Sequence, residues 1–480
     1  MQVAAYTGEM RRRTTAIVGG ATLVALVAGC WGAAHAMGGA QPATTVAARP
    51  AAAVATSAAA PTPAITPTAT ATPKPKPTVQ AVARTCSIAA AARDPRLLHF
   101  QGAVLDVKTG KQLFGRGADT PSRTASVLKV LTTAAALHVL GPGYRLTTKV
   151  VAGSAPGEIV LVGGGDVTLS RTPAGSTPYY AGAPHLSDLA RQVKKAWAAD
   201  PAHKGVKITR IVLDSSYFGG PSWQPSWAVA ERIDGTTPKM TALMVDGDRD
   251  NPYATVSHRS TDPVGRAGSV FAGYFGSVKV TRGTAPAGAR VLGAVHSQPV
   301  STLVKQTLIV SDNTLAETLA RVTAIVSGAG NTFSAEQAGT LGGLQAYGVD
   351  TTGIRIVDGS GLSDDNRVAP RYLTKLMVKV LHRDGALGAL YDGLPIAGRT
   401  GSLSYSDRFQ GAAARADGQV HAKTGWIDTG YTLSGIIHAK DGTMLTFAFY
   451  ALGSISESTK YALDGITADT WACGAKLSNG

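Results

Sequence analysis

The chain has 480 residues, of which 44% are apolar, 6% aromatic and 16% charged, so it is long enough for two or three domains with a sizeable core. It has no repeating glycine period, no sustained heptads and a single long apolar run, which excludes collagen, a coiled coil and a multispan membrane protein. The formal net charge of +15 favours an anionic surface such as a cell wall, and we predict no nucleic-acid partner.

Residues 1–37 have the pattern of an export signal. Arginines at positions 11–13 precede an apolar run over residues 17–27, and Ala34-His35-Ala36 follows it. This order is typical of a secretory signal peptide. No charge interrupts the run, so a retained membrane anchor is one alternative. A lipoprotein is another, because Cys30 after Val-Ala-Gly resembles an acylated cysteine. All three alternatives export the protein to the extracytoplasmic cell envelope.

Residues 38–84 are predicted to form a linker. They contain eight of the 25 prolines in a background of alanine and threonine. Such a segment buries too little apolar surface to offset its ordering entropy, and proline keeps it extended. We expect a tether between the export segment and a folded body.

Two further cysteines, Cys86 and Cys473, stand at opposite ends of that body. A disulfide between them suits an exported protein, and two unpaired buried thiols are the alternative. The sequence contains no CxxC, no HExxH and no cluster of cysteine and histidine. We therefore predict no metal and no cofactor.

The body is predicted to be an α+β fold that is split by a strand-rich inserted domain over residues 146–298. In the flanking parts, 85–145 and 299–480, alternating apolar residues predict strands and helical spacing predicts helices. The predicted strands there are 99–105, 112–114, 420–423, 433–439 and 444–450, and the predicted helices are 125–140, 300–310, 314–326 and 461–470. The insertion is predicted to contain strands 149–151, 159–162, 208–213 and 277–280 and one helix, 186–198.

A serine and a lysine stand three residues apart at the start of the first of these helices. Ser126 and Lys129 therefore share one helix face, and a helix N-terminus provides free N–H groups beside the serine oxygen. A serine hydroxyl becomes a nucleophile when a base is close to it. A lysine amine serves as that base when burial or a second cation lowers its pKa, and Lys423 is the candidate for the second cation.

A second motif, Ser311-Asp312-Asn313, directly precedes another predicted helix. It brings a hydroxyl, a carboxylate and an amide together over three residues. A plain helix cap is the alternative interpretation, because serine and aspartate are favoured at helix N-termini.

The third motif, Lys423-Thr424-Gly425, ends a predicted strand and is followed by Trp426. On a strand edge, Lys423 presents an ammonium group and Thr424 a hydroxyl, which suit a substrate carboxylate. Gly425 allows the backbone to approach a ligand closely. The same three letters occur at residues 108–110, but there they lie in a predicted hairpin turn, which explains them.

The three motifs in this order, in the contexts PSRTASVLKVLTTAAAL, VSDNTLAETLAR and HAKTGWIDTGYTLSG, resemble the serine penicillin-recognising enzymes. Two further features narrow this resemblance to one family. One is the length of the segment between Ser126 and Ser311, 184 residues, and the other is a set of local sequences: LVGGGDVTL, VLDSSYFGGPSW and DGSGLSDDN. They point to the class C low-molecular-mass penicillin-binding proteins, the D-Ala-D-Ala carboxypeptidase/endopeptidase family S13. The resemblance implies a β-lactamase/DD-peptidase-like domain, with an antiparallel sheet flanked by helices, that carries the inserted domain.

The resemblance also implies a set of catalytic roles. Ser126 is expected to attack the carbonyl between two D-alanines and become acylated, while Lys129 takes its proton as general base. Ser311 and Lys423 are expected to relay a proton to the departing D-alanine. Water then releases the acyl group.

Binding roles follow from the same resemblance. Asn313 is expected to hydrogen-bond a substrate amide, and Lys423 and Thr424 to hold the terminal carboxylate. The backbone N–H groups of Ser126 and Trp426 are expected to form the oxyanion hole. The family often has threonine at the position of Trp426, but this role requires only a backbone N–H.

Two more segments are implied to lie at the site. Residues 215–218 of the insertion are expected to touch the substrate. Residues 358–363 (DGSGLS) are expected to line the cleft, with a plain turn as the alternative.

The predicted function is a serine D-Ala-D-Ala carboxypeptidase/endopeptidase that acts on peptidoglycan stem peptides and is acylated by β-lactam antibiotics. A serine β-lactamase is one rival, but no glutamate is placed recognisably to activate a deacylating water. A non-catalytic wall-binding or β-lactam-sensing module is the other, and the intact pair of Ser126 and Lys129 argues against it. The sequence makes no prediction of the oligomeric state.

Overall fold

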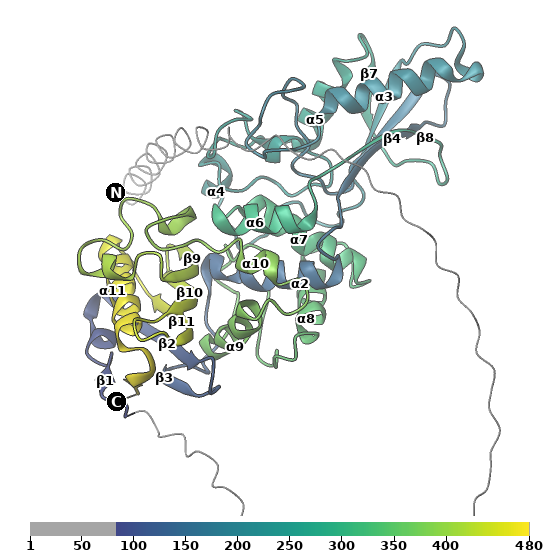
Figure 1. The fold of residues 1–480 in the computed structure, drawn as a ribbon. Helices are drawn as coiled ribbons and strands as arrows, with labels where there is room; N and C mark the ends of the chain where they lie inside the picture. The colour runs from purple at the N-terminus through teal and green to yellow at the C-terminus, as the bar shows by residue number, and fades with distance from the viewer. Residues whose placement is uncertain (1–82, 480) are drawn as a thin grey trace, which may run out of the picture. The chain divides into compact units, whose positions relative to one another are not determined.

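The computed structural model describes residues 83–479, which belong to one compact unit (Figure 1). The predicted leader, residues 1–37, and almost all of the predicted linker lie outside the described residues, so the three alternatives for the N-terminus stay predictions. Among residues 83–479, no helix has both the length and the apolar character needed to cross a bilayer.

A five-stranded antiparallel sheet joins the two ends of the described chain, as predicted for the body. Its strand order is β3-β2-β11-β10-β9, and every neighbouring pair is antiparallel. The pairing of β11 with β2 brings segments together that are more than 300 residues apart in the sequence. The strands are β2 (His99–Asp106), β3 (Gln112–Arg116), β9 (Val420–Ile427), β10 (Gly430–His438) and β11 (Met444–Leu452).

Both faces of this sheet are buried, and the residues of its central strands alternate between two cores. Ile436 and Tyr450 face one apolar cluster together with α9 (Pro370–Leu381). Phe447 faces the other, together with α11 (Glu457–Cys473). Because successive strand residues point to opposite faces, the nearly continuous apolar sequence of β11 suits a sheet that is covered on both faces.

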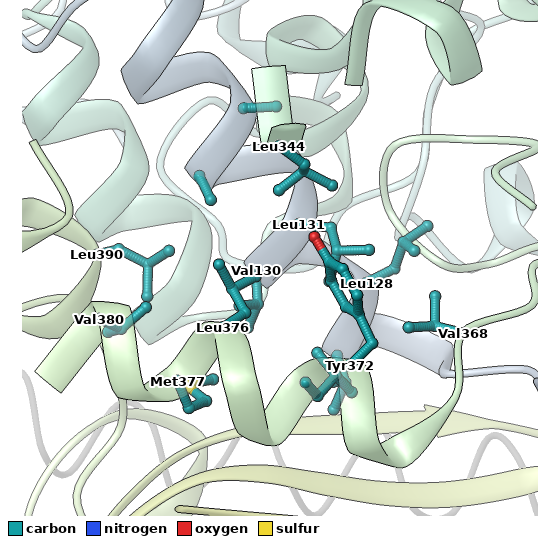
Figure 2. Close-up of a cluster of buried hydrophobic side chains, with 14 of the residues drawn as sticks. Leu128, Val130, Leu131, Leu344, Val368, Tyr372, Leu376, Met377, Val380 and Leu390 are labelled. Carbon is teal, nitrogen blue, oxygen red and sulfur yellow. The ribbon is translucent and has the colours of Figure 1, made fainter. Parts of the chain in front are cut away.

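The helix α2 (Lys129–Val139) lies inside the helical layer and is buried from Lys129 to Leu137. The turn before it, Ala125–Leu128, is a 3-10 helix, so the prediction of one α-helix from residue 125 is wrong over its first four residues. Figure 2 shows Leu128 and Leu131 beside Tyr372 of α9. This packing fixes the turn that carries Ser126.

A second five-stranded sheet contains all strands between residues 147 and 296, in the order β7-β6-β5-β4-β8. It is mixed: β5, β6 and β7 are parallel, and β4 is antiparallel to both of its neighbours. Its elements are β4 (Thr147–Ala152), β5 (Glu158–Val162), α3 (Leu186–Ala199), β6 (Arg210–Asp214), α5 (Pro263–Ala272), β7 (Lys279–Arg282) and β8 (Val291–His296). The helices α3 and α5 cover one face with an apolar core of their own.

The predicted insertion shares a further core with the rest of the body. Phe218, Trp227 and Met244 pack in one cluster with Leu315 and Phe333. The division of the body into two domains therefore stays a prediction. The remaining helices are α4 (Ala230–Ile233), α6 (Val300–Ile309), α7 (Asn313–Val326), α8 (Glu336–Gln345) and α10 (Gly388–Tyr391).

Cys86 and Cys473 form a disulfide, with their Cα atoms 5.4 Å apart. Beside this disulfide, the short strands β1 (Cys86–Ser87) and β12 (Leu477–Ser478) pair in parallel. The disulfide thereby joins β1 to the end of α11, and backbone pairing joins β1 to β12, the last element of the described chain.

Candidate active site

Ser126 lies in the 3-10 turn between β3 and α2, on backbone that is held tightly in place. The residue before it, Ala125, has a positive φ of 46°, a conformation that costs energy for a residue with a Cβ. The hydroxyl of Thr432 on β10 donates to the Thr124 carbonyl over 2.6 Å. Ser126 itself is only 9% exposed, so the turn presents its hydroxyl to a confined space.

Gly425 lies where β9 passes this turn. A Cβ at that position would lie 2.1 Å from Thr432 Oγ1 and 2.8 Å from the Thr124 carbonyl oxygen. Gly425 therefore allows β9 to pack against the turn of Ser126. These contacts give a packing reason for the glycine. The close approach of the backbone to a ligand stays a prediction.

The amine of Lys129 has three polar neighbours. Its Nζ lies 2.7 Å from Ser126 Oγ, 2.7 Å from Asn313 Oδ1 and 2.8 Å from the carbonyl oxygen of Ser360. The last two are pure acceptors and take two N–H bonds. In the neutral amine, the lone pair is then left facing the Ser126 hydroxyl. This is the geometry of a general base beside its nucleophile.

Burial lowers the pKa of Lys129 to about 8. The side chain is fully buried, and removal from water disfavours the charged ammonium form. Four carboxylates oppose this shift, in order Glu317, Asp358, Asp312 and Glu231. The sequence left open whether burial or a second cation lowers the pKa of Lys129, and burial is the dominant cause.

Lys423 and Ser311 form the second pair of the site. Lys423 Nζ donates to Ser311 Oγ over 2.9 Å and to the Thr424 carbonyl over 2.7 Å. Burial, followed by repulsion from Lys129 and Arg408, holds the pKa of Lys423 well below its usual value. Ser311 has a positive φ of 60°, so its hydroxyl is presented from a strained backbone position.

Asn313 begins α7, and Asp312 caps it by accepting from the Leu315 N–H over 2.9 Å. The Asn313 side chain donates to Thr237 Oγ1 over 3.2 Å. Asp312 pairs with the guanidinium of Arg249 over 3.3 Å. Thr237 and Arg249 both come from the predicted insertion, which therefore contacts the second motif directly.

The two lysines join the three motifs into one site. Lys129 links Ser126 to Asn313, and Lys423 links the third motif to Ser311. The remaining residues of the third motif lie beside this network. Thr424 is half-buried and shares a 2.7 Å hydrogen bond with Ser402 Oγ.

Trp426 is also half-buried, on β9 opposite Tyr431 of β10. Its ring lies 6.4 Å from that of Tyr431, measured between centroids. The oxyanion role of its backbone N–H stays a prediction.

The Lys-Thr-Gly sequence at residues 108–110 lies in a turn, as expected. Asp106 Oδ1 accepts from the N–H groups of Lys108 and Thr109, so the upstream KTG closes a hairpin. Phe218 is buried in a core cluster, and the contact of residues 215–218 with a substrate stays a prediction. Within residues 83–479, no three acidic, histidine or cysteine side chains gather in a way that would hold a metal.

Sequence reasoning missed three groups that shape the site: Thr237, the Ser360 carbonyl and Glu317. Thr237 is a lone threonine without a motif, and a backbone carbonyl leaves no mark in a sequence. Glu317 did carry a signal, because it stands four residues after Asn313 and therefore on the same face of α7.

The sequence profile of the D-Ala-D-Ala carboxypeptidase 3 (S13) family matches residues 84–263 and 249–470, which is most of the chain. The chain belongs to this family. The resemblance stated from the motifs is thereby confirmed.

Two relatives in the S13 family are similar over most of their length. Carboxypeptidase DacB of Mycolicibacterium smegmatis is 37% identical over 395 residues, which cover 81% of this chain and 84% of the relative. Carboxypeptidase Rv3627c of Mycobacterium tuberculosis is 36% identical over 404 residues, 83% of this chain and 85% of the relative.

Among solved structures, penicillin-binding protein 4 (dacB) from Haemophilus influenzae matches with a TM-score of 0.64 at 18% identity. The match covers 77% of this chain and 94% of the other. This likeness confirms the predicted fold class, an α+β fold of the penicillin-binding type. The same protein in complex with a β-lactam matches with a TM-score of 0.58.

Proposed function

We propose that this protein is a serine D-Ala-D-Ala carboxypeptidase/endopeptidase that cleaves peptidoglycan stem peptides through an acyl-enzyme. One observation carries the proposal: a fully buried lysine amine lies 2.7 Å from a serine hydroxyl. Its other two neighbours are acceptors. The relatives of the S13 family are named carboxypeptidases, which supports the same reaction for this chain.

Acylation begins with the transfer of the Ser126 proton to Lys129 Nζ while Ser126 Oγ bonds to the carbonyl carbon between the two D-alanines. The negative charge that develops on the carbonyl oxygen is received by the backbone N–H groups of Ser126 and Trp426. Fixed donors of this kind contribute about 3–4 kcal/mol each to lowering the barrier.

The leaving D-alanine needs a proton when the peptide C–N bond breaks. The Ser311 hydroxyl supplies it, and Lys423, which lies 2.9 Å from Ser311 Oγ, replaces the proton on Ser311. Lys423 and Thr424 also attract the carboxylate of the terminal D-alanine. Lys129 then gives the proton taken from Ser126 to solvent, and Lys423 regains one. Water attacks the acyl group with the neutral Lys129 as the base, and Lys129 returns that proton to the Ser126 oxygen as the acyl bond breaks.

The proposed partners are peptidoglycan peptides and β-lactam antibiotics, which acylate the same serine. The proposed location is the extracytoplasmic cell envelope, as expected for a protein that acts on peptidoglycan. We also propose that residues 1–37 direct export, as a cleaved signal peptide, a retained membrane anchor or the start of a lipoprotein. No metal or cofactor takes part in the proposed reaction.

The test makes two measurements on the purified protein, one of penicillin labelling and one of peptide cleavage. Intact-mass measurement after incubation with penicillin should show one penicilloyl adduct, localised to Ser126 by peptide mapping. A pentapeptide ending in D-Ala-D-Ala should release D-alanine. Penicillin turnover well above peptide cleavage would instead support the serine β-lactamase, and labelling without D-alanine release would support the sensing module.

A further inference from the structure

The DGSGLS turn is buried behind the catalytic lysine. The carbonyl of Ser360 accepts from Lys129 Nζ over 2.8 Å, and the carbonyl of Gly359 accepts from the Thr132 hydroxyl over 2.7 Å. Lys129 and Thr132 lie one turn apart on α2. The turn therefore presents two consecutive carbonyls to one face of that helix.

Two glycines allow this close packing. A Cβ at Gly361 would lie 1.9 Å from the carbonyl oxygen of Ala125, next to the nucleophile. A Cβ at Gly359 would lie 2.5 Å from Ala320 Cβ on α7. The turn is thus wedged between α7 and the turn of Ser126, and its backbone is buried, so its N–H groups need internal acceptors.

Glu317 supplies two of those acceptors, and Asp358 accepts from the N–H groups of Gly361 and Ser363. Glu317 Oε1 accepts from the Ser360 N–H over 2.7 Å, and its Oε2 accepts from the Gly359 N–H over 3.1 Å. The Glu317 side chain is fully buried. Both carboxylate oxygens hold the N–H groups of the two residues whose carbonyls face α2, so the carboxylate restrains residues 359 and 360 and with them the Ser360 carbonyl. The N–H of the next residue, Gly361, donates to Asp358 Oδ1 over 2.8 Å.

We propose that Glu317 is a positioning residue for Lys129. Glu317 holds the Ser360 carbonyl against Lys129 Nζ, and its negative charge favours the protonated form of that amine. This inference rests on the proposed function, in which Lys129 is the base. Asn313 and Glu317 then act from one face of α7: the first contacts Nζ directly, and the second acts through Ser360.

The charges around Lys129 agree with this role. Lys129 faces Glu317 on α7, Asp358 in the turn, Asp312 before α7 and Glu231 on α4, and Lys423 faces it from β9. Among the carboxylates, Glu317 has the largest effect on the pKa of Lys129.

Two opposing effects set the pKa of the Glu317 carboxyl. Burial and Asp358 raise the pKa of Glu317 to about 8, and the hydrogen bonds from Ser360 and Gly359 oppose that rise. The carboxylate that the proposed role requires is therefore the main form of Glu317 above about pH 8, and the test covers that range.

The test is the pH dependence of acylation by a fluorescent penicillin, measured for the whole protein and three variants. In Glu317→Gln the negative charge is lost, so the midpoint of the rate profile should move to lower pH by about one unit, the size expected from one nearby buried charge. The maximal rate should fall about tenfold or more, because the amide cannot accept from both N–H groups.

Two further variants separate positioning from simple stability. Glu317→Asp keeps the charge on a shorter side chain and should acylate more slowly with the midpoint of the wild-type protein. Asp166→Asn is the matched control: Asp166 is also buried and accepts from a backbone N–H, but it is not among the four carboxylates with the largest effect on the pKa of Lys129. It should leave the profile unchanged.

A folded Glu317→Gln protein with the wild-type midpoint and rate would overturn the inference, as would a Glu317→Asp protein with the full wild-type rate. Thermal melting of each variant establishes that it is folded. If the wild-type protein is not acylated, the proposed function fails and the inference fails with it. If the wild-type protein is acylated with the expected pH profile and the Glu317 variants behave like it, the proposed function stands and only the role of Glu317 is wrong.

Discussion

Lys129 Nζ donates to Asn313 Oδ1 over 2.7 Å although the two residues are 184 positions apart in the chain. The Asn313 amide also donates one N–H to Thr237 Oγ1. An asparagine side chain has two N–H groups and two lone pairs, so one of each remains for a substrate. The residue can therefore hold the base and bind a peptide amide at the same time.

Replacement of the nucleophile should separate chemistry from folding. Ser126→Ala removes the hydroxyl, while Lys129 keeps its contacts to Asn313 and Ser360. We expect no penicilloyl adduct and a melting temperature within a few degrees of the wild-type protein, since one polar contact is worth about 1 kcal/mol. Intact mass and thermal melting measure the two effects, and an adduct that survives in a folded variant would contradict the assignment of Ser126.

The rate of acylation should rise with pH through a midpoint near 8. Lys129 acts as a base only when neutral, and its pKa lies at about 8 rather than 10.5. At pH 7, about 300 times more of the amine is therefore neutral than in an ordinary lysine. Stopped-flow labelling from pH 6 to pH 10 measures the profile. A flat profile, or one that falls as the pH rises, would argue against Lys129 as the base.

Loss of the third-motif lysine should affect free acids more than amides. In Lys423→Ala we expect cleavage of a D-Ala-D-Ala peptide to fall about 100-fold, because a charge-assisted contact worth about 1.5–3 kcal/mol is lost together with the proton relay. The C-terminal amide of the same peptide should lose less. Lys108→Ala, in the hairpin copy of the motif, is the matched control and should cleave both at wild-type rates.

The contact between Arg249 and Asp312 should be important for stability. Both side chains are almost fully buried, and Arg249→Met would leave the Asp312 carboxylate without its guanidinium. Loss of one partner of a buried pair typically costs about 3–5 kcal/mol. Denaturant unfolding should show this decrease, and the double variant with Asp312→Asn should recover part of it. Equal stability of the single variant and the wild type would contradict the expectation.

The Cys86–Cys473 disulfide should contribute to stability and not to chemistry. Replacing both cysteines by alanine should lower the free energy of unfolding by about 2–4 kcal/mol, because the closed loop restricts the unfolded chain. Penicillin labelling of the folded variant should keep its wild-type rate. Labelling that is lost below the melting temperature would show that the disulfide also shapes the site.

Local patterns predicted most of the strands and helices that carry the site. The apolar run in β11 and the helical spacing within α2 are strong local signals, because burial on fixed faces restricts which positions of an element are apolar. The helix α8 was missed. Gly339 and Gly343 weaken its helical pattern, and a Cβ at either position would lie within 3 Å of α7 or α2 respectively. Close packing between helices thus outweighed helix propensity.

The sequence by itself determined the chemistry of the site, since the three motifs carry the hydroxyls, amines and amide that acyl transfer needs. Only the tertiary structure decided how these groups work together. Burial of Lys129 is a property of the helical layer around α2. Thr237 comes from a segment with no local mark, and the DGSGLS segment was expected at the cleft without any sign that its Ser360 carbonyl would contact Lys129. A side chain's charge state and hydrogen-bond partners depend on what surrounds it in space, and residues hundreds of positions away supply those surroundings.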